Sequence, residues 1–333
     1  MKSLIKEAID SLFTARRSSS YGYGPNFYCN RLQKLFFLCV AYGIALGLPT
    51  HTMAESSNTS KQKPSYVKFD IESRATPLAH VDGENILSTN TFFSASSGYP
   101  ITRQHIFLLS VDFFATTYDW QNLSWSASEG QPNFALAHSY GITPGFLWKV
   151  NEKSTLLFFN HFQASEAGDS NFADTLSYSG SLILSRKMSA SLKLSAVLFV
   201  QYQLDNKWSV LPVPAFSWQA NPDFKIELSG RSGGPFLRGS LKARSKTQIF
   251  AEGRFEKLKY QTQNANNEQA IFSDQAWIAL AGLQYQQRPK WYWEVSTGIN
   301  FARALRLDPQ SGAELEISTS ASPLVLFKTH FEF

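Results

Sequence analysis

The chain ends on Pro323-Leu-Val-Leu-Phe-Lys-Thr-His-Phe-Glu-Phe333, a segment in which two kinds of side chain alternate. Counted back from the last residue, one parity is apolar except at Thr329 and comprises Val325, Phe327, Phe331 and Phe333. The other parity carries Lys328, His330 and Glu332. Successive side chains of a strand point to opposite faces, so the segment predicts a β-strand with one apolar and one mostly polar face. A membrane barrel uses such a strand to pair with its first strand, because pairing leaves no free edge.

The ending Phe331-Glu332-Phe333 resembles the C-terminal signal of bacterial outer-membrane β-barrels, which the barrel-assembly machinery recognises. The family pattern prefers a glycine where this chain has Lys328 and a polar residue where it has Leu326. The resemblance implies that Phe327, Phe331 and Phe333 form an assembly signal. It also implies that the partners are outer-membrane lipids and the assembly machinery.

Residues 1–54 predict a signal segment. The apolar run Leu35–Leu48 follows Arg31 and Lys34 and leads to a small-x-small site, which places cleavage between Ala54 and Glu55. The run is short for a transmembrane helix, although an N-terminal anchor stays open as the alternative. Residues 1–30 fit either an extended signal or a start codon placed too far upstream. The expected location is the bacterial outer membrane, reached by export through the periplasm.

Removing residues 1–54 changes the charge and the cysteine content. That segment holds six Lys and Arg against two Asp and Glu, so removing it lowers the net charge from +5 to +1. A nucleic-acid partner therefore has no support in the charge. Cys29 and Cys39 leave with the segment, so the remaining chain has no disulfide framework and no thiolate metal site.

Residues 55–333 predict a single all-β domain, an antiparallel transmembrane β-barrel of about fourteen strands, with twelve as the alternative. No long uncharged apolar run occurs there; alternation instead recurs every ten to fifteen positions. The expected strands cover 66–73, 86–96, 104–117, 134–148, 154–163, 174–186, 190–204, 208–219, 223–231, 236–244, 247–260, 272–286, 290–303 and 323–333. Short polar turns alternate with longer segments at 164–173, 261–271 and 304–322, and the short turns are expected at the periplasmic end.

Aromatic residues near the ends of the expected strands support this architecture, since such rings favour the headgroup level of a membrane. The residues are Trp148, Trp208, Trp218, Trp277, Trp291, Trp293, Tyr202, Tyr260 and Tyr285. With these features, residues 55–333 resemble uncharacterised porin-like outer-membrane barrels of Gram-negative bacteria. The resemblance is one of architecture and implies no particular substrate.

The side chains expected to face the lumen are most informative within residues 223–260. If the apolar parity faces lipid, a charged wall faces inward, formed by Lys225, Glu227, Arg231, Arg238, Lys242, Arg244, Glu252, Arg254 and Glu256. Two interpretations stay open. The wall could attract anions to a pore, or its charges could form a salt-bridged ladder that fills the lumen. The interleaved carboxylates favour the ladder.

Catalysis of the serine type requires a serine, a histidine and a polar residue that orients the histidine, and the sequence shows no clear set of these three. His138 and Ser139 are adjacent on one expected strand, so they point to opposite faces and cannot pair. His161 could meet a serine of a neighbouring strand, but serine is abundant, and a solvated or hydrogen-bonded histidine is the simpler expectation. No metal-ligand spacing and no phosphate loop appear. We expect no catalytic residue, no metal and no cofactor.

The predicted function is a porin-like channel or transporter for small solutes, and not an enzyme. Two alternatives remain: a lipid-modifying enzyme of the phospholipase or deacylase type, and a closed barrel with a structural or binding role. Apolar side chains expected in the lumen, Ile278, Leu280, Leu324 and Leu326, argue against a wide aqueous channel.

Overall fold

The structure is a computed structural model that describes residues 66–81, 84–119, 134–168, 172–202, 204, 208–231, 234–263, 268–309 and 314–333. The predicted signal segment and its cleavage site between Ala54 and Glu55 lie outside these residues. Among the described residues, no helix is long and apolar enough to cross a membrane.

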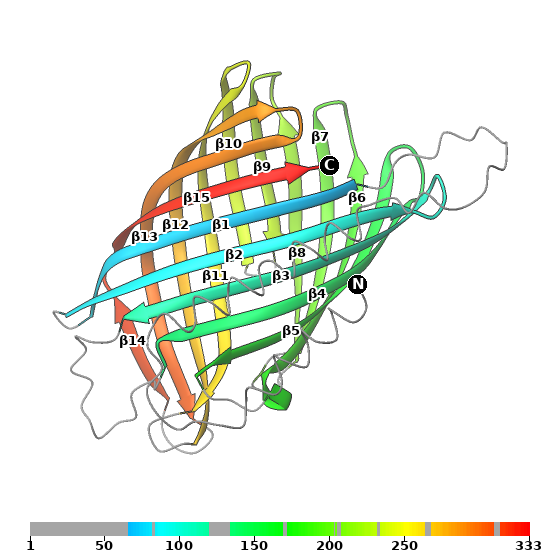
Figure 1. Cartoon of the computed structure of the whole chain (residues 1–333). Coiled ribbons are helices and arrows are strands. Elements are labelled where there is room, and N and C mark those ends of the chain that lie inside the picture. The colour runs from blue at the N-terminus through cyan, green and yellow to red at the C-terminus, as the bar shows by residue number, and fades with distance from the viewer. Residues whose placement is uncertain are drawn as a thin grey trace, which may run out of the picture. The chain divides into compact units, whose positions relative to one another are not determined.

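The described strands form one closed antiparallel β-barrel (Figure 1). They are β1 (Tyr66–Val81), β2 (Glu84–Pro100), β3 (His105–Asp119), β4 (Leu136–Lys149), β5 (Ser154–Ala167), β6 (Leu176–Lys187), β7 (Leu192–Tyr202), β8 (Trp208–Gln219), β9 (Phe224–Arg231), β10 (Gly234–Arg244), β11 (Thr247–Gln263), β12 (Gln269–Arg288), β13 (Trp291–Pro309), β14 (Leu315–Thr319) and β15 (Ser322–Glu332). A short 3-10 helix, η2 (Phe172–Thr175), precedes β6.

From β1 to β14 each strand pairs with the next, and β15 pairs with β1 from Lys68↔Glu332 to Ala75↔Val325, which closes the barrel (Figure 1). Both β14 and β15 pair with β13, so these two segments form one interrupted strand. The wall therefore has fourteen strands, and the predicted fold class is confirmed. The last strand lies beside the first because backbone groups in a membrane must all find partners.

The predicted alternation of short turns and longer loops holds with two corrections. The segment 261–271 is mostly strand, because β11 runs to Gln263 and β12 begins at Gln269. The segment 304–322 is also mostly strand, since β13 runs to Pro309 and β14 follows. Arg306 stabilises this extension by pairing with Glu314 and Glu316 of the opposing strand. The end with the longer connections is called the long-loop end below, and the other end is called the short-turn end.

Strand lengths divide the barrel into two sectors. The long sector comprises β11–β13, with 17, 20 and 19 residues, and β1–β3, with 16, 17 and 15. The short sector comprises β6–β10, with 12, 11, 12, 8 and 11 residues. Towards the long-loop end, β5 passes the short sector and pairs directly with β11 in parallel, at Glu166↔Gln261. The barrel therefore narrows at that end.

The outer face of the barrel is apolar along the strands. On β11, Ile249 is exposed while its neighbour Phe250 is buried on the inner face, and the paired strand repeats the pattern at Leu241. Exposed Phe and Leu side chains occur in the same way on β5 and β6, at Phe158, Phe162, Leu182 and Leu184. The alternation read from the sequence thus gives each strand an apolar outer face.

Candidate functional site

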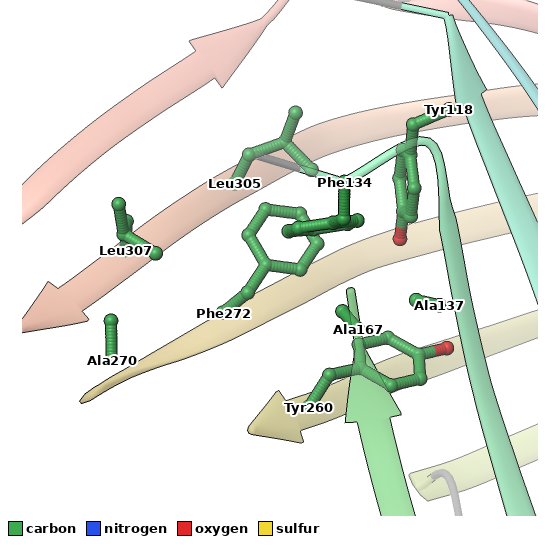
Figure 2. Packing of buried hydrophobic residues seen from close by; sticks show 9 residues of the cluster. All are labelled: Tyr118, Phe134, Ala137, Ala167, Tyr260, Ala270, Phe272, Leu305 and Leu307. Atoms are coloured by element: carbon green, nitrogen blue, oxygen red, sulfur yellow. The ribbon is translucent and has the colours of Figure 1, made fainter. Parts of the chain in front are cut away.

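The barrel interior is the candidate site, and its long-loop end is filled by apolar side chains. Figure 2 shows Tyr118, Phe134 and Phe272 gathered in one cluster. Their rings meet edge to face at centroid distances of 5.1 to 5.9 Å, a favourable aromatic geometry. The complete cluster is Tyr118, Phe134, Ala137, Ala167, Tyr260, Ala270, Phe272, Leu305 and Leu307. It occupies part of the interior at this end.

Tyr260 in this cluster corrects the sequence prediction. It was expected at the headgroup level, but its ring is 1% exposed and stacks on Phe272 in the interior. Its hydroxyl lies 3.3 Å from Thr116 Oγ1 on β3. Tyr260 lies inside because it is an even number of residues from Glu252, Arg254 and Glu256 on β11 and therefore shares their inner face.

Between the aromatic cluster and the short-turn end, ion pairs cross the lumen. Arg254 lies within 3.2 Å of Glu72, 3.4 Å of Glu252 and 2.8 Å of Glu256. Arg74 Nη1 donates to Glu256 at 2.6 Å. Glu72 and Arg74 belong to β1, which is not a sheet neighbour of β11, so these contacts bridge the interior rather than one ladder. Such pairs hold opposite walls together.

Arg238 anchors a second part of the network. Its guanidinium contacts Glu252 at 3.4 Å and Glu294 at 2.8 Å, and it lies 3.8 Å above the Phe250 ring. Arg238 and Glu252 are register partners on β10 and β11, whereas Glu294 comes from β13. The contacts therefore favour the ladder interpretation of the charged wall, extended across the lumen.

The other predicted wall residues lie outside this network. Lys225 and Glu227 share the inner face of β9 and pair with each other at 2.7 Å, both more than a third exposed. Lys242 lies four residues after Arg238 on β10, so the two share a strand parity, and Lys242 is exposed near the short-turn end. Arg244 lies beyond a register shift and is exposed. The side chain of Arg231 lies outside the described part of the chain.

The sequence prediction missed a buried pair formed by Arg303 and Asp274. Arg303 donates from Nε to Asp274 Oδ1 at 2.9 Å and from Nη2 to Oδ2 at 2.6 Å, a bidentate contact. Tyr118 donates to the same carboxylate at 2.9 Å. Among the described residues, the pair borders a small polar cavity with room for about one water molecule, lined also by Asn300.

A β-bulge explains why the strand pattern missed this pair. Ala302 on β13 has a positive φ of 49°. The β12–β13 register shifts between Gln275 and Trp277. The bulge reverses parity along β13, so Asn300 and Arg303 both face inward. Simple alternation from Trp291 would have placed Arg303 on the lipid side.

The apolar residues predicted for the lumen form one buried cluster. Ile278 and Leu280 on β12 pack with Leu324 and Leu326 on β15, together with Ala276. This cluster narrows the interior beside the ion pairs.

The assembly-signal residues lie on the outer face at the short-turn end. Phe327 and Phe333 are exposed, and Phe331 pairs with Phe69 in the β1–β15 ladder. The Phe333 ring meets Phe69 edge to face at 6.0 Å, and the Phe331 ring lies 5.2 Å from Trp291. The resemblance to an assembly signal stays a prediction.

The histidines singled out in the sequence have hydrogen-bond partners. His161 Nδ1 lies 2.8 Å from Thr143 Oγ1 and 3.7 Å from Asp112 Oδ1, while Nε2 faces Gln163 at 3.1 Å. The hydroxyl and the carboxylate thus meet the same nitrogen, whereas a catalytic relay needs them on opposite nitrogens. Within the described residues, no group of three metal-binding side chains occurs.

No family model and no curated protein matches the chain. Solved structures with similar folds include the toluene transporter TodX of P. putida, at 9% identity over 81% of this chain and 90% of that chain, with a TM-score of 0.38. An outer membrane channel from Pseudomonas putida F1 shows 10% identity over 84% and 100%, with a TM-score of 0.41. The translocator domain of the autotransporter NalP from Neisseria meningitidis shows 11% identity over 92% and 98%, with a TM-score of 0.33.

Proposed function

We propose that this chain is a bacterial outer-membrane channel or transporter for small solutes, with a lumen that side chains constrict. The observation that carries the proposal is the difference between the two faces of the barrel wall. Apolar side chains cover the outside, as at Ile249 and Leu241, and charged side chains occupy the inside, as at Arg238 and Arg254.

The outer face supports a membrane location. Soluble proteins rarely expose contiguous apolar patches larger than a few hundred Å². Here exposed Leu, Ile, Val and Phe side chains occur on strand after strand, which is expected where acyl chains cover the wall. Export through the periplasm belongs to the same proposal.

The inner face supports a restricted path. The ion pairs around Arg254 and the aromatic cluster around Phe272 consist of side chains, which can rearrange without breaking the wall. A wide aqueous pore does not fit this interior. The contacts support passage of small solutes and a lumen that is narrow at rest.

Planar-bilayer recording of the refolded chain tests this proposal. We expect small, discrete conductance steps. We also expect Lys242→Glu to shift ion selectivity towards cations, because Lys242 shares the strand parity of Arg238, which contacts Glu294 of β13. Absence of conductance, together with absence of solute flux into liposomes, would favour the closed barrel with a binding role, which the aromatic cluster also fits.

The geometry gives less support to a lipid-modifying enzyme. His138 Nε2 and Glu166 Oε1 lie 2.7 Å apart, a pair of the kind that could orient a catalytic base. However, Ser139 and Ser165, next to each in sequence, are buried on the opposite face of their strands. We therefore propose no catalytic role for this pair.

A further inference from the structure

Two lysines lie opposite each other in the β6–β7 hairpin, at the short-turn end of the barrel. Lys187 and Lys193 are register partners on these strands, and both side chains are exposed. Like charges in directly opposite positions of a sheet destabilise the pairing of the strands. An anion held between the two ammonium groups would remove this repulsion.

Strand parity places both lysines on the inner face of the wall. Leu184 and Leu194 are exposed on the outer face, and each lysine lies an odd number of residues from the leucine on its own strand. Val197, four residues after Lys193, belongs to a buried apolar cluster and shares the parity of Lys193. The two ammonium groups therefore border the interior at its short-turn mouth.

No carboxylate neutralises these two charges within the part of the chain that the structure describes. Glu152, in the neighbouring turn between β4 and β5, is exposed and forms no ion pair with either lysine there. In contrast, Lys225 on the inner face of β9 pairs with Glu227 at 2.7 Å. The positive charge at Lys187 and Lys193 is therefore available to an anion from solution.

Two hydroxyl groups lie beside the lysines on the same face. Ser185 and Ser195 are register partners two residues further into the barrel, and their hydroxyl oxygens lie 2.8 Å apart. Each hydroxyl carries one hydrogen, so one hydrogen joins the two oxygens and the other can be donated to a ligand. Lys187, Lys193, Ser185 and Ser195 are called the lysine–serine patch below.

The turn between β6 and β7 holds this patch in register. Ser189 Oγ accepts hydrogen bonds from the backbone N–H of Ser191 at 3.2 Å and of Leu192 at 3.0 Å. The backbone N–H of Lys187 donates to the Lys153 carbonyl at 2.8 Å, which ties the hairpin to the neighbouring turn. Since the backbone is already ordered, only the two lysine side chains must be fixed when a ligand binds, which lowers the cost of binding.

We propose that the lysine–serine patch binds the phosphate group of small solutes at the short-turn mouth of the interior. A phosphate offers oxygens in several directions, which suits two flexible ammonium groups and a hydroxyl donor. A planar carboxylate is bound better by the fork of an arginine, and the interior arginines Arg238 and Arg254 already pair with carboxylates of the protein. The proposal rests on the proposed channel function and names its substrate class.

Phosphate binding by the refolded chain in detergent micelles tests the site. Inorganic phosphate is the probe, and isothermal titration calorimetry measures its affinity for the unmodified chain and for K187Q with K193Q. Removing both ammonium groups should weaken binding at least about tenfold, because two charge-assisted hydrogen bonds are lost. In planar bilayers, phosphate should lower the chloride conductance of the unmodified chain, and the double variant should lose this block.

The matched control removes two positive charges from the outer face of the same end. Arg186 is exposed and follows the outer parity of Leu184, while Arg244 is exposed and pairs with Thr247, which shares the outer parity of Ile249. R186Q with R244Q should leave the phosphate affinity and the block unchanged. Gel mobility of unheated samples verifies that both double variants are folded.

The outcomes separate the two proposals. If the chain conducts ions but phosphate does not bind, or binds equally well to K187Q with K193Q, the site is wrong and the channel function stands. If the control weakens binding as much as K187Q with K193Q does, overall charge explains the effect and the site is again wrong. If phosphate binds through the patch but the chain passes neither ions nor solutes, the channel function is wrong and the patch stands as a binding site.

Discussion

The long sector and the short sector of this barrel are built from the same kind of strand but are held in different ways. In the long sector, Arg254, Arg74 and Arg303 join walls that are not sheet neighbours. In the short sector, the inner face around Phe199 is apolar, and β8 pairs with β9 through four residue pairs. The comparison contrasts a sector whose walls are joined by charged contacts through the lumen with one whose inner face packs apolar side chains.

The largest expected effect concerns the buried pair in the long sector. Asp274→Ala would leave the buried Arg303 guanidinium without its carboxylate, so the free energy of unfolding should fall by about 3–5 kcal/mol. Urea unfolding in detergent micelles measures this change. Asp223→Ala, at an exposed turn, is the control and should change stability by less than about 0.5 kcal/mol. Equal effects of the two substitutions would contradict the role of the buried pair.

The second prediction compares one substitution in both sectors. Phe272→Ala should lower the free energy of unfolding by about 3–5 kcal/mol, because the surrounding aromatic cluster cannot collapse fully into the cavity. Phe199→Ala should lower it less, because Gly230 of β9 lies beside the Phe199 ring and can move into the space. The same urea titrations test both. A larger loss at Phe199 would mean that the short sector is the rigid one.

A smaller gain in stability is expected at the bulge of the long sector. Ala302 adopts a positive φ of 49°, a conformation that disfavours residues with a side chain. Ala302→Gly should therefore raise the free energy of unfolding by roughly 1 kcal/mol. Ala304→Gly, two residues along β13, provides the control and should lower it. A decrease at both positions would argue against strain at the bulge.

The smallest effect on the stability of the folded barrel is expected at Phe333, where β15 meets β1. Deleting Phe333 removes one edge-to-face contact with Phe69, so refolding into detergent should change little. If the C-terminal resemblance reflects an assembly signal, the amount of heat-modifiable protein in cells should nevertheless fall clearly. Gel mobility of unheated samples measures both. Equal loss in cells and in vitro would mean that Phe333 acts only by packing.

Much of the fold could be predicted from the sequence because alternation is local. The parity of Ile249 and Phe255 against Glu252 and Arg254 fixes which side of β11 is apolar, whatever the neighbouring strands do. The same reasoning identified part of the charged network before any pairing was known. It failed at Tyr260, where proximity to a strand end was taken as a sign of the membrane interface.

The sequence by itself therefore determined most of the strands and, apart from the bulge in β13, which face of each is apolar. Only the tertiary structure decided which charges meet across the lumen, as Arg254 and Glu72 do, and where β5 passes the short sector to reach β11. The physical reason is that alternation is set by each residue's own backbone, whereas register and cross-lumen contacts depend on residues far apart in the chain.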